Sequence, residues 1–282
     1  MIIVNLKGGL GNQMFQYALG RILALKNKDT LKLDTSGYPR QKLRAYGLDT
    51  FNIVENIATK KEIRKLKYPY SIFSMLWRRF SFKILQRHHI GWEPEALKRT
   101  GDIYLDGFWQ SYKYFADQAD IIKQDFSLKE PLENKYPDLV DKVKKTASVS
   151  LHIRRGDYAN SKITNYYHGT CSPRYYREAI EIIKNKVTEP VFFIFTDEPA
   201  WAKANLQFIQ PAVFVADYQL SDGEELALMK ICQHNIIANS TFSWWGAWLN
   251  SHPDKIVIAP KKWANKDNEA FKDLIPPKWI RI

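Results

Sequence analysis

Short apolar segments alternate with helical segments through the second half of this chain, and no other feature limits its fold so strongly. The strand-like segments are 149–153, 191–195, 212–215, 236–238 and 256–258, and the helix-like segments are 173–184, 199–206, 222–233 and 241–249. Parallel strands need a long crossover between them, and a helix is the usual one. The alternation therefore predicts an α/β fold with a parallel, doubly wound sheet.

The first residues predict a unit of the same kind. Ile2–Leu6 has the pattern of a buried strand, Gly8–Gln13 is a glycine-rich turn, Met14–Lys26 has helical spacing and Leu31–Asp34 is a second strand. Strand, helix and strand in this order form a βαβ unit. This half therefore also predicts a parallel sheet.

The boundary between the two halves is marked by composition. Residues 50–100 are basic with a helical pattern, and Tyr104–Trp109 predicts another strand. The polar stretch 129–145, which contains Pro131 and Pro137, is predicted as the linker. We therefore expect two domains, 1–145 and 146–282, facing each other across a cleft.

Net charge limits the classes of partner. The 282 residues carry a formal net charge of +12, which suits nucleic acid, an anionic membrane surface or a phosphate-bearing substrate. The basic residues are scattered and no aromatic RNA-recognition motif is present, which disfavours a nucleic-acid partner. The basic aromatic stretch 77–87 fits peripheral contact with an anionic membrane, or equally a solvated helix face.

Cysteine usage and hydropathy point to the cytoplasm. The two cysteines, Cys171 and Cys232, are too few for a disulfide framework and are expected to be reduced. The first residues are too short for the apolar region of a signal peptide. No apolar run reaches the roughly 18 residues of a membrane span. We therefore expect a cytoplasmic protein.

Two adjacent arginines follow the strand at 149–153. Arg154 and Arg155 precede Gly156 and Asp157, where ligands bind in open α/β sheets. A guanidinium matches a phosphate with two parallel hydrogen bonds. Because side chains alternate along a strand, one arginine can face the ligand while the other braces the structure. We expect Arg154, on the same face as His152, to contact a phosphate; ion pairs with nearby acids are the alternative.

Two further segments have the chemistry of a phosphate site. Gly8–Gln13 lets the backbone turn tightly, and the amide of Asn12 can bond a phosphate or a sugar. Its spacing is not that of a dinucleotide or ATP loop. The small polar residues of 239–243 open a predicted helix, where hydroxyls and N–H groups can cradle a phosphate or simply cap the helix.

Carboxylates suggest a base-recognition site but no metal site. Glu224 and Glu225 open the helix 222–233, where a carboxylate can accept hydrogen bonds from guanine or complement the helix dipole. Asp197 and Glu198 after a strand are equally ambiguous. No Asp-x-Asp pair and no His/Cys cluster at zinc spacing is present. A diphosphate would then be neutralised by arginines and helix starts.

Several stretches in the right order resemble the motifs of α-1,2-fucosyltransferases of glycosyltransferase family 11. The similar stretches are Gly8–Ala18, Gly107–Ser111, His152–Tyr158, Thr196–Glu198 and His234–Trp248. The resemblance spans nearly the whole chain and is closest to bacterial members that build surface polysaccharide. It implies a GT-B architecture, with two Rossmann-like domains and GDP-fucose on the C-terminal one. It also implies inversion at the fucose C1 without a metal.

The resemblance also implies roles for individual residues. Arg154 matches an arginine that contacts the β-phosphate, and Asn12 an asparagine near the β-phosphate and fucose. Thr241 and Ser243 match phosphate-contacting hydroxyls, and Glu225 lies near a possible guanine contact. The expected donor site is completed by three further residues, Arg155, Asn239 and Ser240.

The expected reaction transfers L-fucose to the 2-hydroxyl of a terminal β-galactose in O-antigen-type glycan synthesis. A lipid-linked acceptor at the inner face of the plasma membrane is one option. Asp157 or His152 would serve as general base, and a histidine pKa near 6.5 is better matched to neutral pH than that of an aspartate. The alternatives are another linkage, α-1,6 or protein O-linked, and a basic RNA-binding protein.

Overall fold

The computed structural model describes residues 1–41, 44–67, 89–266 and 268–282, without the side chains of Asp157, Asn160 and Asn268. The basic aromatic stretch 77–87 lies outside the described residues. The chain forms two compact units. Unit 1 comprises residues 1–127 and 270–274, and unit 2 comprises residues 128–269 and 275–282.

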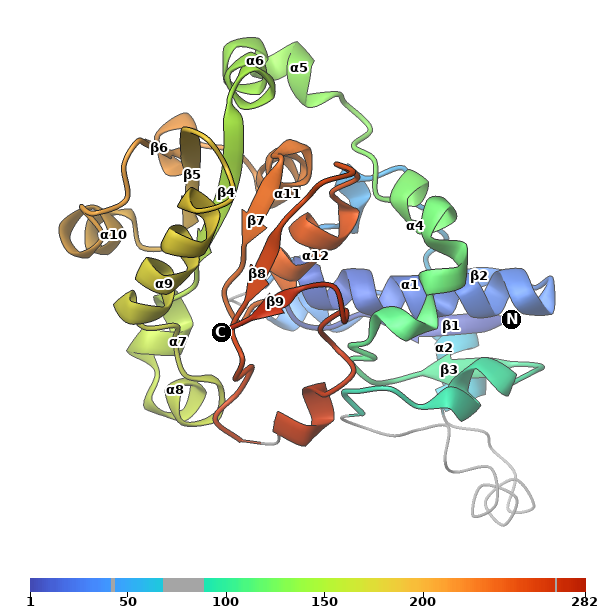
Figure 1. Ribbon diagram of the computed structural model, residues 1–282. Coiled ribbons are helices and arrows are strands. Elements are labelled where there is room, and N and C mark those ends of the chain that lie inside the picture. The colour runs from blue at the N-terminus through green and yellow to red at the C-terminus, as the bar shows by residue number, and fades with distance from the viewer. Residues whose placement is uncertain (42–43, 68–88, 267) are drawn as a thin grey trace. The chain divides into compact units, whose positions relative to one another are not determined.

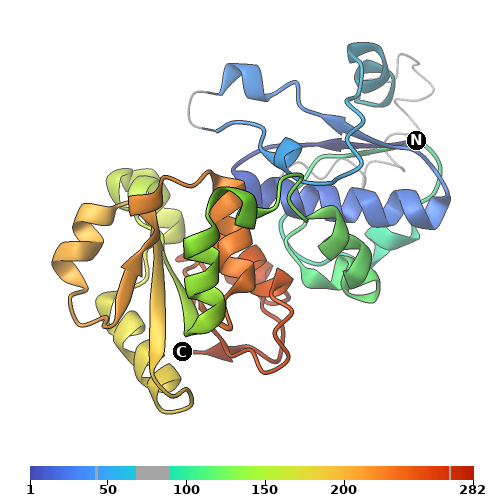
Figure 2. The same cartoon turned by 90° about the horizontal axis from the view of Figure 1, so that it is seen from above.

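Unit 1 is built on a parallel three-stranded sheet in the order β2-β1-β3. Its strands are β1 (Ile2–Asn5), β2 (Leu31–Asp34) and β3 (Ile103–Leu105), and its helices are α1 (Leu10–Asn27), α2 (Lys60–Lys67) and α4 (Ala119–Asp125). The long helix α1 lies along the sheet (Figure 2). Gly20 makes this approach possible, because a Cβ there would overlap Cγ2 of Val4 and lie 3.0 Å from Cδ1 of Leu31.

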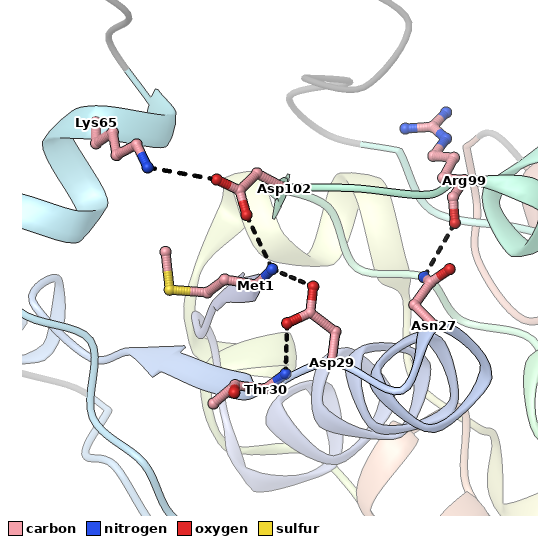
Figure 3. Close-up of polar contacts among 7 residues, drawn as sticks. All are labelled: Met1, Asn27, Asp29, Thr30, Lys65, Arg99 and Asp102. Atoms are coloured by element: carbon pink, nitrogen blue, oxygen red, sulfur yellow. Dashed lines mark hydrogen bonds and ion pairs between the residues drawn. The ribbon is translucent and has the colours of Figure 1, made fainter.

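The start of β1 is fixed by charged groups from three segments (Figure 3). The amine of Met1 donates to the carboxylate of Asp29 and, at 2.9 Å, to that of Asp102. Asp29 also accepts from the backbone N–H of Thr30 at 2.7 Å, and Lys65 lies 3.6 Å from Asp102. These contacts join β1 to the residues that precede β2 and β3, and so fix the register of the sheet.

Unit 2 contains a parallel six-stranded sheet in the order β6-β5-β4-β7-β8-β9 (Figure 1). The strands are β4 (Ala147–Ile153), β5 (Pro190–Thr196), β6 (Ala212–Phe214), β7 (His234–Ile236), β8 (Val257–Ala259) and β9 (Ile280–Arg281). The chain runs outward from β4 to β6 and then returns to the other side of β4. This is the order of a Rossmann-type sheet, and ligands bind where it reverses, here at the carboxyl ends of β4 and β7.

Helices cover both faces of this sheet. The helices of this unit are α5 (Leu132–Lys135), α6 (Pro137–Lys145), α7 (Gly156–Asn160), α8 (Lys162–His168), α9 (Pro173–Lys184), α10 (Pro199–Asn205), α11 (Asp222–Ile231) and α12 (Thr241–Leu249). Leu151 and its odd-numbered neighbours in β4 pack against α9 and α10. Phe193 and Phe195 of β5 pack on the other face, against α6 and α11. The predicted doubly wound arrangement is confirmed for this half.

The boundary between the units differs from the predicted one. Residues 129–145, predicted as a linker, contain α5 and α6, and Leu139, Val140 and Val143 of α6 are buried against β5. These helices therefore belong to unit 2, and the boundary lies near 127 rather than 145. Among the helices that the structure describes, none is both long and apolar enough to cross a membrane.

Gly20→Ala is expected to destabilise unit 1. Alanine favours a helix over glycine by about 1 kcal/mol, but overpacking a core typically costs about 1–3 kcal/mol. The added methyl meets a stiff β-branched side chain, Val4, so the cost should exceed the gain. Thermal unfolding measures the result, with Leu25→Ala on α1, where the side chain is 38% exposed, as control. Equal or higher stability of Gly20→Ala would show that α1 does not need this close approach.

Candidate functional site

Asp197 organises the residues that follow β4. Its Oδ2 lies 2.8 Å from Nη1 of Arg154, and its Oδ1 accepts a 2.9 Å hydrogen bond from the backbone N–H of Arg155. Gly156 allows this approach, because a Cβ there would lie 2.6 Å from Oδ2 of Asp197. The carboxylate thus holds both the backbone and one guanidinium at the carboxyl edge of the sheet. Of the predicted alternatives for the arginines, the ion pair with a nearby acid is present.

The two arginines diverge, as alternation along the strand predicts. The Cζ of Arg155 lies 3.7 Å from the centre of the Trp201 ring on α10, a cation–π contact. Its Nε lies 3.8 Å from the Glu198 carboxylate. Arg155 therefore braces α10 against β4, and its predicted contact with the ligand stays a prediction. Arg154 lies at the carboxyl end of β4, where the order of the strands reverses.

His152, one of the two predicted general bases, is buried at the end of β4. Its side chain faces α12, with its ring centre 5.7 Å from that of Phe242, and the residue is 6% exposed. Burial and the positive charge of Arg154 lower the pKa of His152 to about 3. A neutral imidazole with so weak a conjugate acid gains a proton poorly at neutral pH. Burial thus disfavours His152 as the base, and that role stays a prediction.

The Nδ1 atom of His152 is buried and has no hydrogen-bond partner within the described part of the chain. Such orphaned polar atoms are uncommon in folded proteins. The side chain of Asp157, the other predicted base, lies outside the described residues. Its role stays a prediction.

The start of α12 uses most of its hydroxyls internally. Ser240 is the N-cap, and its Oγ accepts from the backbone N–H of Phe242 at 3.3 Å. The hydroxyl of Ser243 donates to the Ser240 carbonyl at 3.3 Å, and the residue is 1% exposed, so its predicted contact with a phosphate stays a prediction. Thr241 is partly exposed. The helix dipole and the predicted contact of Thr241 with a phosphate are the candidate anion contacts here.

Asn239 joins several segments of unit 2 through hydrogen bonds of its side chain. Its Nδ2 donates to the carbonyls of His168, Gly169 and Trp263 at 3.1, 3.2 and 3.1 Å. Its Oδ1 accepts the thiol of Cys171 at 3.7 Å, and the residue is 4% exposed. Because its amide is occupied by the chain itself, the predicted contact with a donor is replaced by a positioning role.

The two glutamates of α11 have different environments. Glu224 completes a capping box with Ser221 and pairs with Lys135 at 2.7 Å, which is the dipole-complementing role. Glu225 is partly buried, and burial together with the charges of Asp222 and Asp197 raises its pKa to about 7. A carboxyl group with a raised pKa next to a ligand-binding edge is a functional-site candidate.

Asn12 lies at the start of α1 in unit 1. Its Oδ1 accepts from Nε2 of Gln110 at 2.8 Å. Gly8 has a φ of 81°, and a Cβ there would lie 2.6 Å from Nδ2 of Asn12, so the amide lies directly over the glycine turn. The short motifs 8–13 and 107–111 thus meet in one unit. The predicted contact of Asn12 with a phosphate stays a prediction.

Comparison with known proteins identifies the family. The whole chain, residues 1–282, matches the family model described as glycosyl transferase family 11. The chain belongs to this family. It is 34% identical to an α-1,2-colitosyltransferase of Escherichia coli, over 100% of this chain and 99% of that protein. It is also 34% identical to the O-antigen biosynthesis glycosyltransferase WbnK of Escherichia coli, over 98% and 99% of the two chains.

More distant sequence relatives and solved structures also resemble this family 11 glycosyltransferase. Galactoside α-(1,2)-fucosyltransferase 1 of Leontocebus fuscicollis is 26% identical, over 98% of this chain and 73% of that protein. The structure of NodZ α-1,6-fucosyltransferase soaked with GDP-fucose has a TM-score of 0.52 at 15% identity, covering 88% and 91% of the chains. POFUT1 in complex with GDP has a TM-score of 0.51 at 14% identity, covering 91% and 97%. The predicted GT-B fold is confirmed.

Glu225 should make stability depend on pH. A carboxyl whose pKa is raised on folding stabilises the protein below its ordinary pKa of 4.5, and this contribution is lost as the pH rises towards 7. Glu225→Gln should therefore gain stability over the wild type between pH 5 and pH 8. Thermal unfolding at a series of pH values measures the difference.

Glu224→Gln is the matched control, with the opposite sign. Burial would raise the pKa of Glu224, but hydrogen bonds from Lys135 and Ser221 outweigh it and lower that pKa. The ionised form is thus favoured by folding, and this variant should lose stability above about pH 4.5. Parallel pH profiles for the wild type and Glu225→Gln would contradict the assignment of Glu225.

Proposed function

We propose that this glycosyltransferase moves L-fucose from GDP-β-L-fucose to the 2-hydroxyl of a terminal β-galactose, with inversion, in the synthesis of a bacterial surface glycan of O-antigen type. The observation that carries the proposal is the position of Arg154 and the start of α12. They follow β4 and β7, the neighbouring strands at which the order of the sheet reverses. The family and the names of its relatives supply the sugar chemistry.

The reaction is a single displacement. The acceptor hydroxyl attacks C1 of fucose from the face opposite GDP, and the C1–O bond to the β-phosphate breaks. Negative charge grows on the departing phosphate in an oxocarbenium-like transition state. Arg154 and the amino end of α12 with Thr241 stabilise that charge, a preorganised electrostatic effect. Asp157 takes the proton of the acceptor hydroxyl.

We assign guanine recognition to Glu225. An ionised carboxylate can accept hydrogen bonds from guanine N1–H and from the exocyclic amine. Because the pKa of Glu225 is about 7 in the ligand-free protein, ionising it for guanine costs free energy at lower pH. GDP should therefore bind more tightly at pH 8 than at pH 6, and Glu225→Gln should weaken binding at pH 8.

A second donor, GDP-colitose, is favoured by one observation. A relative with 34% identity along the whole chain is an α-1,2-colitosyltransferase. Colitose is the 3-deoxy analogue of fucose, so the two donors present the same diphosphate and the same reacting carbon. Discrimination between them depends on contacts at the sugar 3-position. Competition between GDP-fucose and GDP-colitose in one assay separates the two candidates.

The proposal is tested by incubating the protein with GDP-fucose and a panel of β-galactosides in EDTA, and by reading GDP release, product mass and linkage. We expect an α-1,2-fucosylated galactoside despite EDTA, since arginine and a helix start, without a metal, neutralise the diphosphate. Product only after Mg²⁺ addition would contradict metal independence. An α-1,6 product would overturn the linkage. Neither transfer nor binding of either donor would overturn the proposed function.

Arg154→Ala should lower kcat by about 10²–10³-fold, the usual effect of removing one group that stabilises transition-state charge. The fold should survive, because Arg154 lies at the partly exposed end of β4 with its side chain 20% exposed. Arg174→Ala is the matched control for one lost positive charge, since the side chain of Arg174 on α9 is 87% exposed and pairs with Glu178 of the same helix. A kcat for folded Arg154→Ala within twofold of the control would refute the role.

A further inference from the structure

Helix α8 exposes large apolar side chains close to the candidate donor site. Ile163, Tyr166 and Tyr167 are 74%, 58% and 49% exposed. They make up half of the six large hydrophobic side chains that are exposed in the described ranges, and they lie within five residues. The rings of Tyr166 and Tyr167 are 5.3 Å apart, edge to face, and so form one aromatic surface. Clustered apolar exposure of this kind marks a binding surface.

A chain of ring contacts joins the carboxyl end of α8 to Arg154. Helix α7 begins at Gly156, directly after the two arginines. The guanidinium of Arg154 lies 5.4 Å from the centre of the Tyr158 ring on α7. That ring stacks on His168, the last residue of α8, with centres 4.8 Å apart and planes inclined by 12°. The carboxyl end of α8, which directly follows Tyr166 and Tyr167 in the chain, is therefore joined to the predicted phosphate contact.

The carboxyl end of α8 is held firmly. Asn239, which follows β7, donates to the carbonyls of His168 and Gly169. The carbonyl of Tyr167 accepts from the backbone N–H groups of Asn265 and Lys266 at 2.8 and 3.2 Å. These bonds fix the two tyrosines relative to the edge of the sheet before any ligand arrives, which lowers the entropy cost of binding.

The chemistry of the surface selects an uncharged partner. Helix α8 contains one lysine, Lys162, and the ammonium of Lys266 lies 4.8 Å from the centre of the Tyr166 ring, whereas helices that bind anionic membranes are rich in lysine and arginine. A tyrosine offers a π face with partial negative charge and a hydroxyl that donates and accepts. The C–H-rich face of a hexose ring can stack on the tyrosine ring, and the hydroxyls of the hexose can form hydrogen bonds with the tyrosine hydroxyl.

We propose that Tyr166 and Tyr167 form an acceptor platform, on which a hexose ring of the acceptor glycan stacks beside the donor phosphate contact. The platform rests on the proposed function, because it assumes a saccharide acceptor. It makes α8 a determinant of acceptor specificity and leaves donor binding and bond breaking to other residues.

The test combines Tyr166→Ala and Tyr167→Ala in one variant. We expect the acceptor KM to rise about tenfold, as loss of two aromatic contacts predicts, with kcat within about twofold and GDP affinity unchanged. The double phenylalanine variant should recover most of the acceptor affinity. Tyr218→Ala is the matched control, since Tyr218 is 39% exposed in the 3₁₀ helix Val215–Tyr218 of the same unit.

An unchanged acceptor KM in the folded double alanine variant would overturn the platform. Loss of binding to phosphatidylglycerol vesicles with an unchanged KM for a soluble acceptor would assign the surface to a membrane instead, and would also overturn it. If the wild type transfers sugar to no acceptor, the proposed function fails first. Binding to a glycan array in the presence of GDP then tests the platform. Saccharide binding by the wild type that is lost in the double alanine variant supports the platform. No saccharide binding by the wild type overturns it.

Discussion

The ion pair between Asp197 and Arg154 is the interaction on which the candidate site depends. The two residues follow neighbouring parallel strands, and the last paired residues, Ile153 and Thr196, are in register. Parallel pairing therefore brings the ends of β4 and β5 level, so that the next side chains meet. Asp197 aligns the guanidinium and at the same time accepts the N–H of Arg155. Its negative charge also contributes to the raised pKa of Glu225. One carboxylate thus links the predicted phosphate and guanine contacts.

Burial separates residues that contact a ligand from residues that position one. His152 and Glu225 both lie near the carboxyl edge, and burial favours the uncharged form of each. A neutral His152 adds no positive charge beside the diphosphate, and Glu225 has to ionise before it can accept hydrogen bonds from guanine. Asn239 shows the opposite case, because its amide is consumed by three carbonyls that stabilise the surrounding loops. The presence of Asn239 in the sequence motif therefore reflects its structural role.

Most of the fold could be predicted from the sequence, because strand and helix patterns are local and parallel topology follows from their order. Helix 241–249 was predicted to the residue. The split between Arg154 and Arg155 follows from alternation along β4. The linker prediction failed because Pro137 occupies the first turn of α6, where proline is tolerated, and does not break a helix. The roles of Ser243 and Asn239 could not be predicted, since a pattern does not show which partners satisfy a hydroxyl or an amide.

Helices α7 and α8 escaped prediction for a related physical reason. A surface helix is recognised by an apolar face that packs on the core, and the apolar side chains of α8 are exposed instead. Packing alone does not account for this helix, whose end is held by Asn239 and by backbone N–H groups of residues 265 and 266. A helix stabilised through its polar end, with its aromatic residues left in solvent, keeps those residues available to a partner. The hydrogen bonds that occupy the Asn239 amide also hold the carboxyl end of α8. They therefore explain how a binding surface can stay fixed without being buried.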